Sequence, residues 1–121
     1  MDTNILLIED EEVIIRLLSR KLASMGYNVI LAMDGQEGLE KMRESCPDLV
    51  LLDIIMPQKG GFEVLEEMKR DADLAKVPVI IISNSGQPLE LERAKRLGVT
   101  DWLVKTEFDP KEVVQKIKKY L

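Results

Sequence analysis

Short runs of apolar residues recur along the chain, and four of them end at a polar side chain. These four runs are rich in Val, Ile and Leu and occupy residues 5–8, 49–52, 79–82 and 102–104. Runs of this length without a polar interruption are typical of parallel strands that are buried on both faces. Together with a less regular apolar segment, they predict five strands, at residues 4–9, 27–32, 49–53, 78–82 and 99–104.

Helical periodicity fills the segments between these strands. It predicts helices at residues 11–25, 34–44, 62–70, 86–97 and from 110 onward. Gly26 and Gly98 are placed to end helices, Asp34 and Asp109 to cap them, and Pro110 suits a first helical turn. Regular alternation of strand and helix predicts one α/β domain over residues 1–121, with a parallel sheet, right-handed crossovers and helices on both faces.

The first helix carries more apolar residues than one stripe requires. The residues spaced to pack on the sheet are Ile14, Leu18, Leu22 and Met25. Val13 and Leu17 fall off this stripe, beside two arginines. Two interpretations are open: the buried face of the helix is wide, or Val13 and Leu17 belong to an exposed patch on which a partner docks.

Composition narrows the classes of function. The chain has 121 residues and a net charge of −5, from 22 acidic and 17 basic residues, which disfavours direct binding of nucleic acid. It has no histidine, which removes histidine-based catalysis and histidine-type zinc sites. One cysteine, no signal peptide and no apolar stretch of membrane-spanning length predict a cytoplasmic protein that does not contact the membrane.

The polar residues that follow the four runs have complementary chemistry. Glu9 and Asp10 follow the first run, Asp53 the second, Ser83 the third and Lys105 the fourth. Each alone has an ordinary structural explanation, such as a helix cap or an exposed charge. The carboxyl ends of parallel strands meet at one edge of the sheet, however, where open α/β sheets bind ligands. Three acids there suggest a divalent cation, and a cation with Ser and Lys suggests a phosphoryl group.

These residues carry a family resemblance that covers essentially the whole chain. With Asp53 the motif runs Asp-Ile-Ile-Met-Pro, and Gly60 and Gly61 follow it. With the strand-end residues, the chain resembles the receiver domain of two-component response regulators. The resemblance implies a doubly wound (βα)5 flavodoxin-like three-layer sandwich, with a five-stranded parallel sheet of order 2-1-3-4-5 and the site at its topological switch point.

The resemblance also implies residue roles. Asp53 would be the nucleophile that accepts a phosphoryl group. Asp10, Asp53 and the backbone carbonyl of Ile55 would bind Mg²⁺ directly, and Glu9 would act through a water molecule. Lys105 and Ser83 would contact phosphoryl oxygens, and Trp102, three positions before the lysine, would follow Ser83 in a conformational switch. The domain would catalyse its own phosphorylation and dephosphorylation without being a conventional enzyme.

The implied partners are proteins. The phosphoryl donor would be a sensor histidine kinase or a histidine phosphotransfer protein. The surface of the fourth helix, fifth strand and fifth helix would contact a downstream effector, or a second copy of the chain in a homodimer that forms on phosphorylation. Neither nucleic acid nor membrane would bind this domain directly.

Two residues depart from the family pattern. Thr106 stands where the family usually has a proline after a cis peptide bond, and Asn84 where it usually has a small residue, which predicts altered dephosphorylation kinetics. The main alternative is an atypical receiver that binds proteins independently of phosphorylation. A magnesium-dependent phosphatase is disfavoured because residue 55 is Ile rather than a second acid, and a flavin-binding domain because no phosphate loop follows the first strand.

Overall fold

Five parallel strands form one sheet in the computed structural model, which describes residues 3–54, 59–84, 88–105 and 109–121. The strands are β1 (Asn4–Ile8), β2 (Asn28–Ala32), β3 (Leu49–Asp53), β4 (Val79–Ser83) and β5 (Asp101–Val104). Their order in the sheet is β2-β1-β3-β4-β5, and every neighbouring pair is parallel. The predicted doubly wound order is therefore confirmed.

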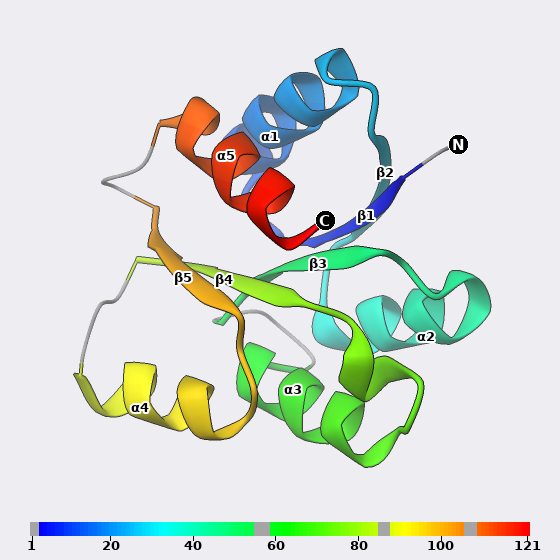
Figure 1. The fold of residues 1–121 in the computed structure, drawn as a ribbon, viewed down its shortest axis with the longest axis vertical. Helices are drawn as coiled ribbons and strands as arrows, with labels where there is room; N and C mark the ends of the chain where they lie inside the picture. Colours follow the sequence, from blue (N-terminus) through cyan, green and yellow to red (C-terminus); the bar gives the residue numbers. More distant parts are fainter. Residues whose placement is uncertain (1–2, 55–58, 85–87, 106–108) are drawn as a thin grey trace.

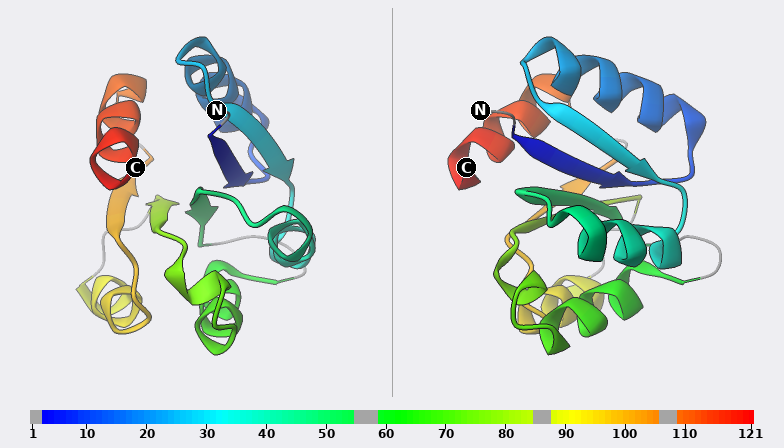
Figure 2. Two further views of the ribbon diagram at one scale, coloured as in Figure 1. Left: turned by 45° about the vertical axis from the view of Figure 1, so that its right-hand side comes forward. Right: turned by 90° about the vertical axis from the view of Figure 1, so that its right-hand side faces the viewer.

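Helices cover both faces of the sheet and complete the three-layer sandwich (Figures 1 and 2). On one face lie α1 (Glu12–Ser24) and α5 (Pro110–Tyr120). On the other lie α2 (Gly35–Ser45), α3 (Gly61–Arg70) and α4 (Pro88–Arg96). A 3₁₀ helix, η1 (Leu74–Lys76), that the sequence pattern did not predict precedes β4. Over the described part of the chain, no helix combines the length and apolar content that a membrane span requires.

Alternate residues of each strand enter opposite layers of the core. In β1, Leu7 lies in the cluster that contains Leu18 of α1, whereas Ile8 lies in the cluster that contains Leu39 of α2. All four side chains are 0% exposed. Because both faces of the strand are covered, successive residues must all be apolar, which explains the uninterrupted runs.

The helix boundaries follow the predicted signals. Gly26 and Gly98 have φ of +89° and +84° just beyond α1 and α4, a conformation that favours glycine. The carboxylates of Asp34 and Asp109 each accept a 2.8 Å hydrogen bond from a backbone N–H in the first turn of α2 and α5. Local chemistry thus sets where these helices begin and end.

Two local predictions were wrong. Met25, expected in the buried stripe of the first helix, is 39% exposed because α1 has already ended at Ser24. The fifth strand begins at Asp101 rather than at residue 99. The preceding residue, Thr100, is hydrogen-bonded to the backbone of Val79 through both its N–H and its hydroxyl oxygen, so it aligns the strand without belonging to it.

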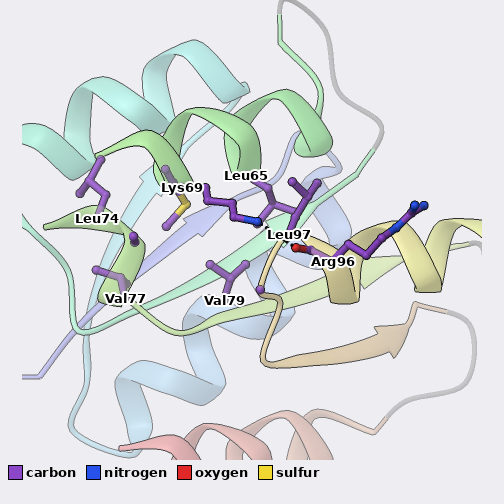
Figure 3. Close-up of a pocket in the computed structure, with 10 residues that line it drawn as sticks. Leu65, Lys69, Leu74, Val77, Val79, Arg96 and Leu97 are labelled. Carbon is purple, nitrogen blue, oxygen red and sulfur yellow. Dashed lines mark hydrogen bonds between the residues drawn. The ribbon is translucent and has the colours of Figure 1, made fainter. Parts of the chain in front are cut away.

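An apolar pocket of about 240 Å³ lies between α3, η1, β4 and the end of α4 (Figure 3). Its lining includes Leu65, Val79 and Leu97. At the pocket, Lys69 donates a 3.1 Å hydrogen bond to the backbone carbonyl of Arg96. None of the predicted site residues lines this pocket.

Candidate functional site

The carboxyl edge of the sheet gathers the buried polar side chains. Glu9, Asp53 and Ser83 are 1%, 5% and 1% exposed, and they are the buried polar residues of the described part of the chain. They stand at the ends of β1, β3 and β4, which neighbour one another in the sheet. A buried polar group is costly unless it is paired, so their concentration at one edge marks a site.

Three carboxylates of this edge lie close together. One oxygen each from Glu9, Asp10 and Asp53 lies within 4.8 Å of the others. Asp10 is exposed while the other two are buried, so the cluster is open to solvent on one side. Carboxylate oxygens at this spacing are the hard donors that Mg²⁺ and Ca²⁺ prefer, and the residues present therefore fit a divalent cation. Ile55, the predicted backbone ligand, lies outside the described residues.

The carboxylate of Glu9 is oriented by the backbone that follows it. Its Oε2 accepts hydrogen bonds from the N–H groups of Asp10, at 2.9 Å, and Glu11, at 3.2 Å. These are N–H groups at the entry to α1, where a carboxylate is favoured by the helix dipole. The backbone just before α1 therefore holds the Glu9 carboxylate in the acidic cluster.

A buried cation directly after β5 joins the cluster. Lys105 Nζ lies 2.6 Å from Glu9 Oε1, 3.2 Å from Asp53 Oδ2 and 3.4 Å from Glu11 Oε1, and the Lys105 side chain is only 4% exposed. The structure thus brings together the predicted lysine and two of the predicted acids. Glu11 was not predicted as a site residue. Its only sequence signal is its position directly after Glu9 and Asp10.

Burial and neighbouring charges shift two protonation equilibria. Burial, followed by repulsion from Asp53, raises the pKa of Glu9 to about 7, although the hydrogen bonds from Lys105 and the Glu11 backbone oppose the rise. Burial by itself would lower the pKa of Lys105. The hydrogen bond to Glu9 and the charge of Asp53 outweigh that effect and raise it. The lysine therefore stays charged, whereas Glu9 binds a proton near neutral pH.

Ser83 is the last residue of β4, and Trp102 is the second residue of the neighbouring strand β5. The Ser83 carbonyl accepts a 2.7 Å hydrogen bond from the Lys105 N–H, which ties the two strand ends together. Trp102 is half-buried, pairs with Ile81 in the strand register and lines a pocket of about 170 Å³ between α4 and β5. The predicted switch residues are thus in neighbouring strands, one beside the acidic cluster and one beneath α4.

The predicted docking residues lie on the surface of α1. Val13 is 76% and Leu17 43% exposed. With Arg16 and Arg20 they line a shallow surface hollow of about 340 Å³. This exposure disagrees with the interpretation of a wide buried face, and docking of a partner on this patch stays a prediction.

Comparison with known proteins decides the family. The family model described as the response regulator receiver domain matches residues 5–118. The chain belongs to the response regulator receiver domain family. Members of this family are not conventional enzymes.

Full-length relatives and solved structures agree with the assignment. The chain is 36% identical over 117 residues to a probable transcriptional regulator, ycf27, of Guillardia theta, covering 97% of this chain and 44% of that protein. It is 33% identical over 121 residues to the alkaline phosphatase synthesis transcriptional regulatory protein PhoP of Bacillus subtilis, covering 100% and 49%. The chain therefore spans about half the length of the curated relatives it matches.

Two solved receiver structures are close in shape. The chemotaxis protein CheY4 of Vibrio cholerae superposes with a TM-score of 0.92 at 27% identity, with complete coverage of both chains. The phosphorylated cyanobacterial phytochrome response regulator RcpA superposes with a TM-score of 0.85 at 31% identity, covering 98% of this chain and 91% of that one. The receiver fold is thus shared over essentially the whole chain.

Proposed function

We propose that this receiver domain is a phosphoacceptor in a two-component phosphorelay, with Asp53 as the acceptor. The observation that carries the proposal is the burial of the Asp53 carboxylate beside Lys105, 3.2 Å away, within a cluster of three acids. An Asp53 oxygen forms a bond to phosphorus while the P–N bond of a donor phosphohistidine breaks. The imidazole takes the electron pair of that bond and is reprotonated as it leaves.

Glu9, Asp10 and Asp53 would hold Mg²⁺ together with the backbone carbonyl of Ile55. When bound, Mg²⁺ neutralises charge on the incoming phosphoryl group, and the remaining task of the chain is positioning. Asp10 and Asp53 would supply direct ligands, and Glu9 would act through a water molecule. Glu9 must release its proton for this role. Cation binding and protonation therefore compete in the cluster.

Lys105 and Ser83 would stabilise the phosphorylated form. The ammonium group pairs with one phosphoryl oxygen, and the hydroxyl group donates to another. Charge-assisted hydrogen bonds contribute about 1.5–3 kcal/mol each, enough for two of them to shift a two-state equilibrium strongly. Movement of Ser83 pulls the end of β4, and Trp102 follows it in β5. Self-catalysed dephosphorylation then returns the domain to its resting state.

The change would reach partners through α4, β5 and α5. The donor is a sensor histidine kinase or a histidine phosphotransfer protein, and the recipient is an effector protein or a second copy of the chain. RcpA, of which the phosphorylated form has been solved, supports phosphorylation as the input. The net charge of −5 supports an output by protein contact rather than direct nucleic-acid binding by this domain.

The test uses Trp102, the single tryptophan of the chain, as a probe. Its fluorescence is followed during a Mg²⁺ titration and then on addition of beryllofluoride, which mimics an aspartyl phosphate. We expect a change at each step and loss of the second change in Asp53→Asn. Calorimetry with Mg²⁺ detects binding even if that binding leaves the Trp102 fluorescence unchanged. If calorimetry detects no Mg²⁺ binding and the fluorescence does not change on either addition, the chain acts instead as a phosphorylation-independent interaction module.

A further inference from the structure

The chain approaches α2 closely at Lys59, shortly after Asp53. The Lys59 carbonyl accepts a 3.2 Å hydrogen bond from the N–H of Gly35, the first residue of α2. A Cβ atom at Gly35 would lie only 2.3 Å from that carbonyl oxygen. Glycine at position 35 therefore permits an approach that any other residue would block, and it anchors the backbone of Lys59.

The side chain of Lys59 is anchored separately, on α3. Its Nζ forms an ion pair and hydrogen bond with Glu67 Oε2. The other Glu67 oxygen lies 3.7 Å from Nη2 of Arg43 on α2. The Lys59 and Glu67 side chains are 22% and 29% exposed, so water screens the pair only partly. The hydrogen bond from Lys59 is the main cause of a lowered pKa at Glu67.

The residues after Lys59 lead directly to the backbone of the phosphoacceptor. The N–H of Gly61 donates a 2.8 Å hydrogen bond to the carbonyl of Ile54. A Cβ atom at Gly61 would lie 2.6 Å from the Asp53 carbonyl oxygen. Lys59 is thus two residues before Gly61, whose backbone is hydrogen-bonded to Ile54 and packs closely against Asp53.

We propose that Glu67 is a positioning residue for the acidic cluster: by holding Lys59, it keeps residues 59–61 packed against Asp53 and Ile54 and so keeps the Asp53 carboxylate oriented for Mg²⁺. The inference rests on the proposed function. Glu67 itself touches none of the three acids in the described contacts and acts through Lys59 and the backbone of Gly61.

The experiment measures Mg²⁺ affinity of the purified chain by calorimetry for wild type, Glu67→Gln, Lys59→Met and the double variant. Glu66→Gln is the matched control, because it removes the same charge from the neighbouring residue of α3, whose partner is Arg93. We expect Glu67→Gln and Lys59→Met each to weaken Mg²⁺ binding about two- to fivefold, the range of a partly exposed ion pair. The double variant should be no weaker than either single variant.

The sign of the Lys59→Met effect separates positioning from long-range electrostatics. Removing a cation near an acidic cluster would, by charge alone, tighten Mg²⁺ binding. Tighter binding in Lys59→Met, or equal effects of Glu67→Gln and Glu66→Gln, would overturn the proposal. Lys59→Arg, which keeps the ion pair, should retain wild-type affinity. Absence of Mg²⁺ binding in the wild type would instead refute the proposed function on which the inference rests.

Discussion

Lys105 Nζ lies 2.6 Å from Glu9 Oε1, and both side chains are almost completely buried. The same ammonium group is 3.2 Å from Asp53 Oδ2. One cation just after β5 thus contacts two carboxylates at the ends of β1 and β3, and links the ends of strands that are not all neighbours in the sheet. The residue proposed to bind the phosphoryl group is thus also the cation that pairs with these buried carboxylates.

Replacement of Lys105 by Met should destabilise the domain. The variant leaves Glu9 and Asp53 buried without their shared cation, which typically costs about 3 kcal/mol. Urea unfolding at pH 7.5 without divalent cations measures the loss. Added Mg²⁺ should recover stability in the variant, because cation binding favours the native state. A variant as stable as the wild type in the absence of Mg²⁺ would show that Lys105 does not support the folded cluster.

The raised pKa of Glu9 predicts a definite pH dependence of stability. The native pKa is about 7 and the ordinary value 4.5, because burial, followed by repulsion from Asp53, disfavours the charged form. Between these values the folded chain keeps a proton that the unfolded chain has lost. Stability contributed by Glu9 is therefore complete below pH 4.5 and lost as the pH rises through 7, by up to about 1.4 kcal/mol per pH unit.

Glu9→Gln isolates this contribution. Urea unfolding of the wild type and the variant is compared at pH 5, 6, 7 and 8 without divalent cations. The free energy of unfolding of the wild type should fall relative to that of Glu9→Gln from pH 5 to pH 7. Above about pH 8 the difference between the two should stay constant. Acids with lowered pKa values, such as Glu67, titrate below this window and do not obscure it. Parallel curves throughout would show that Glu9 has an ordinary pKa.

The strands and the predicted site constellation follow from local sequence, whereas the pairing of side chains does not. The apolar runs predict β1 and β3, and parallel packing then brings Glu9 near Asp53. The 4% exposure of Lys105 and its contact with Glu11 depend on the conformations of long side chains from segments that are far apart in the sequence. The same holds for Lys59 and Glu67, which no pattern or spacing relates. The sequence pattern did not predict η1 because a helix of three residues is too short to show a periodic pattern of apolar residues.

Asn84 offers a test of phosphoryl lifetime. It directly follows Ser83 at the end of β4 and is exposed. Its side chain, larger than the residue usual in the family at this position, should hinder the water that hydrolyses the aspartyl phosphate. Asn84→Ala is therefore expected to dephosphorylate severalfold faster, measured as phosphate release after loading with a small phosphodonor. An unchanged rate of phosphate release would show that the Asn84 side chain does not control the lifetime of the aspartyl phosphate.

Asp101 links β5 to α5 and should stabilise the domain above acidic pH. Its carboxylate accepts hydrogen bonds from the Trp102 N–H at 2.8 Å, Lys116 at 3.0 Å and the Tyr120 hydroxyl at 3.1 Å. Burial would raise its pKa, but these bonds together lower it. Asp101→Ala should cost about 1–3 kcal/mol at pH 7 by urea unfolding. The stabilisation from a lowered pKa is complete above the ordinary value of 3.8, so the difference should shrink as the pH falls from that value through the lower native pKa.

Arg93 should control how firmly α4 is held. Among the described residues of α4, Ala94 is the buried one, so side-chain contacts with α3 carry much of the attachment. Arg93 Nη2 lies 3.0 Å from Glu66 Oε1, and its guanidinium group stands 4.3 Å from the centre of the Phe62 ring. Arg93→Met removes both contacts and should cost about 1 kcal/mol. Hydrogen exchange of the α4 amides should accelerate correspondingly.

Lys95→Met is the matched control for Arg93→Met, because it removes the same charge from the same helix without touching Glu66 or Phe62. Its α4 amides should exchange at the wild-type rate. If the two variants exchange alike, the attachment of α4 comes from elsewhere, and the 3.1 Å hydrogen bond from Lys69 to the Arg96 carbonyl (Figure 3) is the next contact to remove. Faster exchange confined to Arg93→Met would identify the Arg93 contacts with Glu66 and Phe62 as the restraint that any movement of α4 toward a partner must overcome.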